Sequence, residues 1–506
     1  MRVARCVYQF ISSVDIRQER DIERLREAAL LLESENQRLV EKVSQLVREL
    51  AGAKGEDAQQ IQLRIAELEA QLARRNRMLF EPSSEKRPRP GAPPREGKPQ
   101  RGHGPTPQPE LPVVEKVVEL PAADRKCTSC GGEVETWAGQ FEESEEVDTL
   151  ERKFVLVKHR RQKYRCRCGG CVETAPAPLK LFEGARYSIE FAIEVAISKY
   201  LDHLPLERQV RIMDREGLEV TSQTLWDYIE RLVRLLEAAH TRLGLYQLLQ
   251  AVLGADETRW PLMGAPPEER SKWYVWALSS PRAIFYKILD SRSAEAAAEV
   301  LGDYEGVLMV DGYSAYEALR KRGGRFKLAH CWSHVRRELL AAEATHPQAG
   351  EALRLIGELY AVERLCATGP PGDEERLRLR AERSKPAVQQ LHAWALEQRT
   401  LPEGALGKAI AYMGGLWPGL LLFLEDGRIP VDNNATERAI RGPVIGRKNH
   451  YGSRSKRGTE VAAVIYSLVE SAKLCGLDPR AYLRAAVHAA LKGEQVPLPH
   501  ELPAAA

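Results

Sequence analysis

Two aspartates follow apolar segments and could bind metal ions together. Asp256 closes the segment AVLGA, and Asp311 closes the segment GVLMV before a glycine. Such segments are typical of buried strands, and ligands of open α/β sheets gather at the carboxyl ends of strands. An unpaired carboxylate there is costly, which favours metal binding, although either aspartate could instead cap the next turn or helix. Glu257 is a rival to Asp256, but strand alternation points it to the other face.

A third acid, Glu437, lies in the segment IPVDNNATERAIRGPVIGRKN. The segment predicts a loop and then a helix capped by Asn434 or Thr436, which we expect Gly442-Pro443 to end. Arg441 follows Glu437 by four residues, so a plain ion pair on one helix face is the alternative to a metal site. Three carboxylates on rigid supports would suit phosphodiester chemistry, because two hard divalent ions require oxygen ligands.

A cluster of cysteines predicts a separate zinc site. Cys127 and Cys130 have the spacing with which two thiolates bind one tetrahedral Zn²⁺. Cys166, Cys168 and Cys171 offer three thiols for the two remaining places, and the last two repeat the spacing of the first pair. Small buried cysteines without metal are the alternative. In a cytosolic chain, clustered cysteines favour metal over disulfides.

Two histidines flank another cysteine, Cys331. His330 and His334 could form a second metal site with it, but we favour histidines in the core or on a helix face.

Composition limits the classes of protein to consider. A chain of 506 residues suggests two to four domains, and 43% hydrophobic with 29% charged residues is typical of a folded soluble protein. No uninterrupted apolar run approaches the roughly 18–20 residues of a membrane span. The apolar run near the N-terminus is too short for a signal peptide. We therefore expect a cytoplasmic protein with no membrane partner. The net charge of +3 indicates no partner, but residues 438–457 carry seven Lys and Arg and no acid.

The N-terminal part has the pattern of a coiled coil. Leucines recur every seven residues over 22–50, with Asn36 as one polar position in the second seam. Such a polar position fixes register and oligomer state, so we expect self-association, with a helical hairpin as the alternative. Residues 81–112 are rich in Pro and basic residues and predict a linker.

The remaining segments predict a mixed α/β order. Residues 204–233 indicate two helices around a turn at Glu216-Gly217, with Thr221 or Ser222 as cap. This resembles a helix-turn-helix, although any helical hairpin with a glycine turn looks alike. Strands and helices alternate over 250–340 around a central sheet, with a hairpin expected around Ser280-Pro281-Arg282, and 345–425 is helical throughout.

Several segments in the right order resemble one known family. The segments ADETRW, MVDGYSAYEAL, HCWSHVRRE and DNNATERAIR, with YRCRC and GRKN, look like the large transposase of the insertion sequence 66 family. The resemblance implies a ribonuclease-H-like core with a DDE triad, which is Asp256, Asp311 and Glu437 here. The gap of 126 residues between the last two fits a helical insertion.

The resemblance also implies cofactors, partners and DNA contacts. The triad would hold two Mg²⁺ or Mn²⁺ ions, and Zn²⁺ would be structural, with Cys166 favoured as a ligand and the fourth ligand left open. The partners would be the transposon terminal inverted repeats, target DNA, a second copy of the chain through the coiled coil, and small accessory proteins of the same element. When bound to DNA, the protein would be associated with the nucleoid. The basic residues expected to contact DNA are Arg438, Arg441, Arg447 and Lys448.

We therefore expect an α/β protein with a ribonuclease-H-like catalytic core, a helical insertion, an N-terminal coiled coil and a small zinc-binding module. The expected divisions are a coiled coil 1–80, a linker 81–112, a zinc-binding module 113–178, a helix-turn-helix-like segment 179–245, the first part of the core 246–344, an insertion 345–425, the second part of the core 426–475 and a helical tail 476–506.

The expected activity is metal-dependent cleavage at transposon ends, followed by attack of the freed 3′-OH on target DNA. A DNA-binding descendant without catalysis and a metal-dependent nuclease without strand transfer are the alternatives. Three intact carboxylates argue against the first of these.

Overall fold

A computed structural model describes residues 154–165, 172–366 and 370–503, with a few positions between 41 and 68. The residues from 154 onward belong to one compact unit. The expected coiled coil, the linker 81–112 and the five clustered cysteines lie outside the described residues, apart from those few positions.

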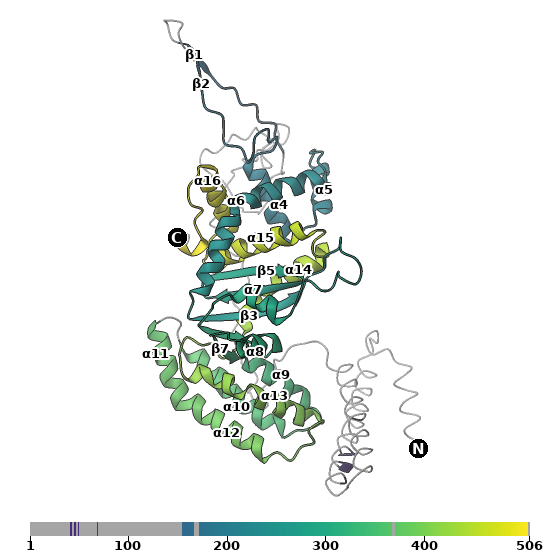
Figure 1. Cartoon of the computed structure of the whole chain (residues 1–506), viewed down its shortest axis with the longest axis vertical. Helices are drawn as coiled ribbons and strands as arrows, with labels where there is room; N and C mark the ends of the chain where they lie inside the picture. Colours follow the sequence, from purple (N-terminus) through teal and green to yellow (C-terminus); the bar gives the residue numbers. More distant parts are fainter. Residues whose placement is uncertain are drawn as a thin grey trace, which may run out of the picture. The chain divides into compact units, whose positions relative to one another are not determined.

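A five-stranded mixed sheet lies at the centre of the described part (Figure 1). The strand order is β5-β4-β3-β6-β7; β3, β4 and β5 are antiparallel, whereas β6 and β7 run parallel to β3. Ser280 pairs with Ala283, which confirms the hairpin expected at Ser280-Pro281-Arg282. The strand bounds are β3 Val252–Arg259, β4 Tyr274–Ser280, β5 Ala283–Leu289, β6 Val307–Val310 and β7 Lys327–His330.

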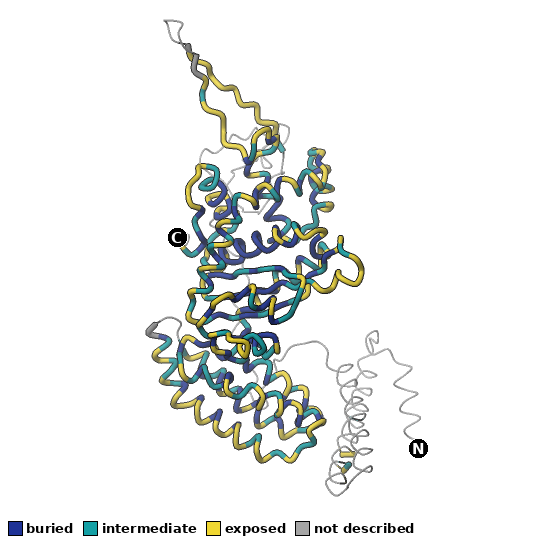
Figure 2. Tube along the Cα trace, viewed as in Figure 1, coloured by how far each residue is buried: buried dark blue, intermediate teal, exposed yellow. Residues whose placement is uncertain are grey.

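Helices cover both faces of the sheet, as expected for an α/β protein. Alternate residues of β3 and β4, such as Leu253 and Trp276, pack with α7 (Ala294–Leu301) and α8 (Ser314–Lys321). Residues of the opposite face, such as Val275 and Tyr286, pack with the long helices α6, α14 and α15. Figure 2 shows that α15 is buried along nearly its whole length. These helices span Ser222–Leu248, Asn434–His450 and Lys456–Leu474.

The two helices expected on either side of Glu216-Gly217 are present before the sheet. α5 (Leu206–Arg215) ends before Gly217, whose φ of +84° suits glycine, and α6 follows. Thr221 is the cap of α6, because its hydroxyl accepts from the backbone N–H of Thr224 at 3.1 Å. α4 (Ile189–Tyr200) and α16 (Pro479–Leu491) pack beside α6.

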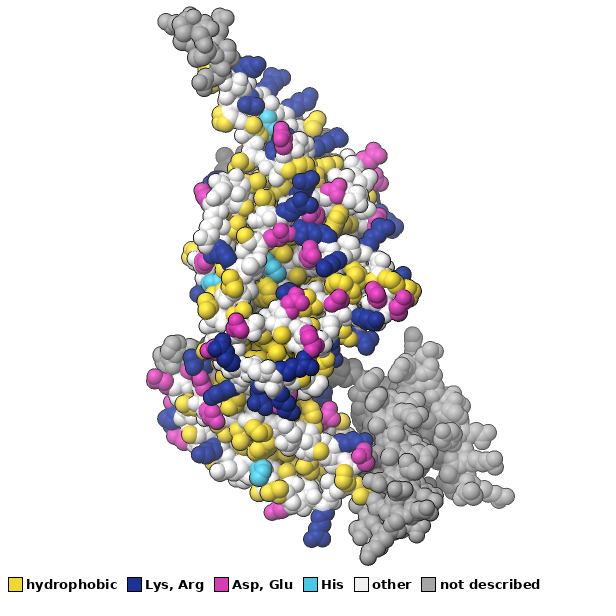
Figure 3. All heavy atoms as spheres, viewed as in Figure 1, with side chains coloured by type: hydrophobic (Ala, Val, Ile, Leu, Met, Phe, Trp, Pro, Cys, Tyr) yellow, Lys and Arg dark blue, Asp and Glu magenta, His cyan; other side chains and the backbone are white. Residues whose placement is uncertain are grey.

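An extended arm precedes these helices in the chain. Its short strands β1 (Lys163–Arg165) and β2 (Val172–Thr174) are antiparallel, and Lys and Arg side chains line it (Figure 3).

A second group of helices lies between β7 and α14 in the chain. It has its own buried core, which includes Trp332, Ile356 and Leu391. The helices are α9 Trp332–Glu343, α10 Ala349–Leu365, α11 Pro370–Leu379, the π-helical turn Arg380–Ser384, α12 Lys385–Glu397, α13 Ala405–Leu421 and the 3₁₀ turn Leu422–Leu424.

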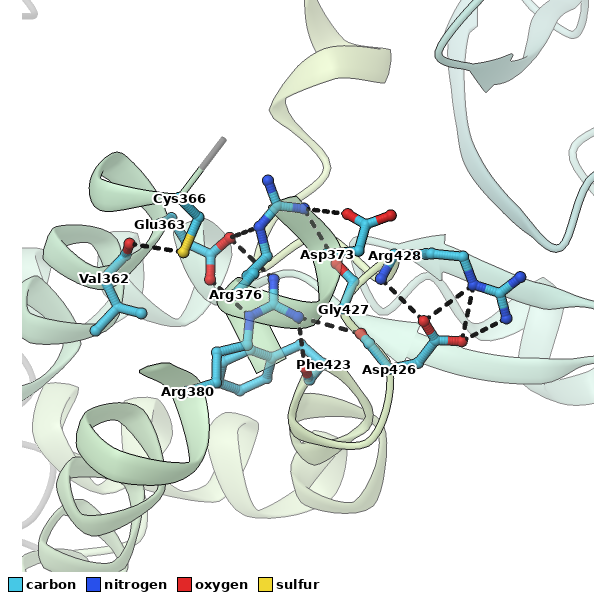
Figure 4. Close-up of polar contacts among 10 residues, drawn as sticks. All are labelled: Val362, Glu363, Cys366, Asp373, Arg376, Arg380, Phe423, Asp426, Gly427 and Arg428. Carbon is cyan, nitrogen blue, oxygen red and sulfur yellow. Dashed lines mark hydrogen bonds and ion pairs between the residues drawn. The ribbon is translucent and has the colours of Figure 1, made fainter. Parts of the chain in front are cut away.

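A buried arginine ties this group to the loop that precedes α14. Arg380 has no exposed surface and donates to Glu363 at 2.7 Å and 2.9 Å. Its guanidinium also donates to the carbonyls of Phe423 and Asp426 (Figure 4). A charge buried this deeply requires such partners. The contacts therefore fix the loop that leads to α14.

Among the described residues, one segment, Ala405–Leu424, is both long enough and apolar enough to cross a membrane. Length and composition alone are weak evidence, and α13 packs against α9 and β7 within the protein.

Three expectations about element ends were wrong. β3 continues to Arg259, so Asp256 lies within the strand rather than at its end. The cap of α14 is Asn433, not Asn434 or Thr436. α14 also passes through Pro443 to His450. Proline removes the hydrogen bond to the carbonyl four residues earlier, here Ala439, and the Tyr286 hydroxyl donates to that carbonyl instead at 2.7 Å.

Candidate active site

The strand register places Asp256 and Asp311 side by side. β3 and β6 are parallel, and Gly254 lies opposite Met309. Two residues further along, the same register places Asp256 opposite Asp311. Neighbouring strands lie about 4.8 Å apart. Leu253 and Leu308 belong to the core beneath α7 and α8, so residues of the other parity, including both aspartates, face the opposite side.

The first turn of α14 lies on that same side of the sheet. The Thr436 hydroxyl lies 2.6 Å from the Ser279 hydroxyl of β4, and the Asn433 side chain donates to the carbonyl of Ala255 at 2.8 Å. A Cβ on Gly254 would lie 2.0 Å from the Thr436 hydroxyl, so only glycine permits this approach. These contacts bring Glu437, the residue after Thr436, to the side of the sheet that carries the two aspartates.

The carboxylates of Asp311 and Glu437 act on the charge of Asp256. The pKa of Asp256 is raised to about 7, first by burial and then by the nearby carboxylates of Glu257, Asp311 and Glu437. Among the described residues, one hydrogen bond, from the backbone N–H of Glu257 at 2.8 Å, opposes this shift. An aspartate whose neighbours are carboxylates suits a bound metal ion, because the ion would offset their combined negative charge. We refer to Asp256, Asp311 and Glu437 as the acidic triad.

Glu257 lies on the other face of β3, as strand alternation predicts. Its buried carboxylate accepts from Arg292 at 2.8 Å and from the Tyr316 hydroxyl at 2.9 Å. The Arg292 guanidinium stacks on the ring of Tyr313, 3.7 Å from its centre. The Glu257 carboxylate is therefore paired with Arg292 and Tyr316 on its own face of the sheet.

The turn after β6 shapes the backbone at Asp311. Gly312 has a φ of +101°, which favours glycine, and the backbone N–H of Tyr313 donates to the Asp311 carboxylate at 2.9 Å. The hydroxyl of Tyr412, from α13, donates to the Asp311 carbonyl at 2.6 Å. A helix from the second group thus contacts the backbone of a triad residue.

α9 supplies two basic residues beside Glu437. His334 Nε2 lies 3.7 Å from one Glu437 carboxylate oxygen, and an Arg337 nitrogen lies 4.0 Å from the other. The basic groups within 4.0 Å of the Glu437 carboxylate therefore belong to α9 and not to Arg441, the partner in the alternative to a metal site. His330 is partly buried against Gly419 of α13. A Cβ added to Gly419 would lie 2.4 Å from Cδ2 of His330.

The basic residues of α14 divide into two kinds. Arg438, Arg441 and Lys448 are exposed and recur at helical spacing, so they share one face. Arg447 is half-buried and donates to the Thr258 hydroxyl at 3.0 Å and to the carbonyl of Arg259. The first three are free to meet a partner, whereas Arg447 also ties α14 to the end of β3.

The sequence reasoning did not find the residues that support the triad. Gly254 lies 179 positions before Asn433 and 182 before Thr436, so its contact with them depends on the fold. Tyr412 carries no local signal at all. The motif DNNATE did contain a hint, because two asparagines and a threonine before a helix are polar groups that need partners.

Comparison with known proteins identifies the class of protein. The model of the "Transposase IS66 family" matches residues 184–461, and that of the "zinc-finger binding domain of transposase IS66" matches residues 124–169. The chain therefore belongs to the IS66 family of transposases, and its zinc-finger domain indicates zinc binding.

Relatives from Sinorhizobium fredii strain NGR234 support this assignment. The chain is 34% identical over 393 residues to the uncharacterized protein y4jD, covering 74% of this chain and 76% of that protein. It is 31% identical over 398 residues to the uncharacterized protein y4qI, covering 74% and 71%. The similarity to y4hP is 27% over 394 residues, covering 72% and 70%.

Proposed function

We propose that this chain is an active DNA transposase that cuts the ends of its element and joins them to target DNA. The proposal depends most on one observation: the fold gathers Asp256, Asp311 and Glu437 from β3, from the turn after β6 and from the first turn of α14. Membership of the IS66 family supports the class of reaction.

We further propose that the sheet is a ribonuclease-H-like core with a helical insertion. The strand order supports this, because three consecutive antiparallel strands are followed by two that are parallel to the first. The helices from α10 to α13, which separate β7 and α9 from α14, would be the insertion.

The acidic triad suits divalent ions of the Mg²⁺ or Mn²⁺ class. All its ligands are carboxylates, which hard cations prefer, and one buried oxygen of Glu437 has no hydrogen-bond partner among the described residues. Asp256, Asp311 and Glu437 would hold the ions. When bound, two such ions would stabilise the charge that develops on the phosphate and on the entering and leaving oxygens. The chain itself would orient these ligands through Thr436, Asn433 and Tyr412.

We also propose the following for the part of the chain outside the described residues. The zinc-finger match covers Cys127, Cys130, Cys166 and Cys168 but ends before Cys171, which supports those four as the zinc ligands. The N-terminal heptads would join two copies, and DNA ends and target would be the partners.

The test is a cleavage and joining assay on labelled element ends with Mg²⁺ or Mn²⁺. We expect Asp256→Asn, Asp311→Asn and Glu437→Gln each to abolish cleavage while DNA binding is kept. Glu257→Gln is the matched control beside Asp256, although it will also lower stability. Full cleavage in any triad variant would remove that residue from the mechanism. Nicked products that are never joined would instead indicate a nuclease. If the wild type bound DNA without cleaving it, the chain would be a non-catalytic descendant of a transposase.

A further inference from the structure

A thiol, an imidazole and a carboxylate meet beside the acidic triad. Ligand atoms of Cys331, His334 and Glu437 all lie within 4.8 Å of one another. Cys331 precedes α9, His334 lies in its first turn, and Glu437 lies in the first turn of α14. Two helix N-termini therefore bring the three groups together, and Glu437 is the residue that this cluster shares with the acidic triad.

Two polar atoms in this cluster lack hydrogen-bond partners among the described residues. His334 Nδ1 and Glu437 Oε1 are buried atoms with no hydrogen-bond partner among the described residues. The distance of 3.7 Å between His334 Nε2 and Glu437 Oε1 is too long for a hydrogen bond between them. Buried polar atoms without partners are uncommon, and a bound ion is one explanation for them.

Hydrogen-bond donors surround the Cys331 sulfur. Burial raises the pKa of this thiol, so an ion that binds there would displace its proton. The backbone N–H of Asn433 donates to its sulfur at 3.2 Å, and the Ser333 hydroxyl lies 3.1 Å away. Hydrogen bonds from outside the ligand set orient and stabilise metal ligands in this way. The sulfur also lies at the N-terminus of α9, where the helix dipole favours negative charge.

We propose that Cys331, His334 and Glu437 form a binding site for a divalent ion of the Zn²⁺ class, which overlaps the acidic triad at Glu437. A thiolate and an imidazole select soft or borderline ions, whereas Mg²⁺ prefers the all-carboxylate triad. Tetrahedral ligands about 2.0–2.3 Å from zinc lie about 3.3–3.8 Å apart, so small side-chain movements would close the site.

Binding at this site would withdraw Glu437 from the acidic triad. The ion would therefore inhibit the reaction, and this consequence rests on the proposed function. Binding itself does not rest on it, so the two can be tested separately.

The binding test is a Co²⁺ titration of the full chain after its structural zinc site has been filled with Zn²⁺. We expect one thiolate-bound Co²⁺ per chain, seen as a thiolate-to-cobalt charge-transfer band. The band should vanish in Cys331→Ser, and Co²⁺ affinity should fall at least about tenfold in His334→Gln and Glu437→Gln. Cys366→Ser and Cys475→Ser are matched controls that keep the band. His334→Gln keeps the test valid if Cys331→Ser does not fold. Absence of the band in the wild type, or its persistence in Cys331→Ser, would overturn the site.

The inhibition test adds Zn²⁺ to the Mg²⁺-dependent cleavage assay. Wild type and Cys475→Ser should lose activity, whereas Cys331→Ser should tolerate at least about tenfold more Zn²⁺. Equal inhibition of Cys331→Ser would refute the regulatory role. A cobalt band in a protein that never cleaves DNA would refute the proposed function and leave the ion site standing.

Discussion

At the scale of single residues, the metal-free triad carries an electrostatic cost at Asp256. Its pKa of about 7 lies above the roughly 3.9 of an aspartate in an unfolded chain, mainly because of burial. The folded state therefore holds a proton that the unfolded state loses between about pH 4 and pH 7. In this window the free energy of unfolding falls as the pH rises.

Asp256→Asn should remove this cost. Without divalent metal, we expect the variant to match the wild type below about pH 4 and to be more stable by about 1–4 kcal/mol above pH 7, at 1.36 kcal/mol per pKa unit. Denaturant unfolding at several pH values measures this. The exposed Asp303→Asn should show no such trend. A variant less stable than the wild type at pH 8 would contradict the argument.

The sequence was informative about the residues that carry charge and less so about those that hold them. Asp256 and Asp311 follow strand-like runs, so a place for both on the central sheet could be predicted, although β3 continues past Asp256. The position of His334 near Glu437 could not, because 103 residues separate them and the contact depends on how α9 and α14 meet.

At the scale of elements, the close packing of α14 on β3 depends on a missing side chain. A Cβ on Gly254 would lie 2.0 Å from the Thr436 hydroxyl and 2.8 Å from the Asn433 side-chain oxygen. Gly254→Ala should therefore displace the first turn of α14, with a loss of about 1–3 kcal/mol in unfolding free energy. Calorimetry or denaturant unfolding checks this value.

The matched control is Gly357→Ala in α10, where an added Cβ meets nothing within 4 Å. Alanine there should be neutral or stabilise the helix by up to about 1 kcal/mol. If the two variants had equal stability, the packing of α14 would not depend on Gly254.

A second contact between elements joins α13 to the turn after β6. Tyr412→Phe removes the 2.6 Å hydrogen bond to the Asp311 carbonyl and should cost about 1–2 kcal/mol of stability. Under the proposed function, it should also weaken stabilisation by Mg²⁺, measured as the rise in melting temperature. Tyr482→Phe removes a similar bond to the Pro497 carbonyl and should leave the Mg²⁺ response unchanged. An equal Mg²⁺ response in both variants would mean that Tyr412 does not act on the triad.

The elements were easier to predict than their ends. Alternating segments gave the hairpin and the central sheet, because strand periodicity is local. The passage of α14 through Pro443 could not be foreseen, since it depends on Tyr286 of β5, which lies 153 positions from Ala439.

At the scale of the whole molecule, the second group of helices supports the triad through two sets of contacts. Tyr412 contacts the Asp311 backbone, and Arg380 fixes the loop before α14 that leads to Glu437. This group is therefore part of the framework of the triad.

The exposed face of α14 offers the last prediction. Arg438, Arg441 and Lys448 share one face of the helix that also carries Glu437, so DNA that enters the triad would pass over them. For each side chain that no longer neutralises a phosphate, the dependence of log K on log salt should fall by about 0.9. We expect Arg438→Gln, Arg441→Gln and Lys448→Gln together to lower the slope by about 2 to 3 and to weaken binding to all sequences alike. Titration of labelled DNA at several salt concentrations measures this.

Two controls make that experiment specific. Arg378→Gln removes an exposed arginine that is paired with Glu375 and Glu382, and it should leave the salt slope unchanged. Arg447→Gln should lower stability, because its guanidinium is bonded to Thr258 and to the carbonyl of Arg259 at the end of β3. If the triple variant kept the wild-type slope, DNA would have to reach the triad by another face. The arm that carries β1 and β2 would then be the next surface to neutralise, because its cations lie on an exposed extension of the same unit.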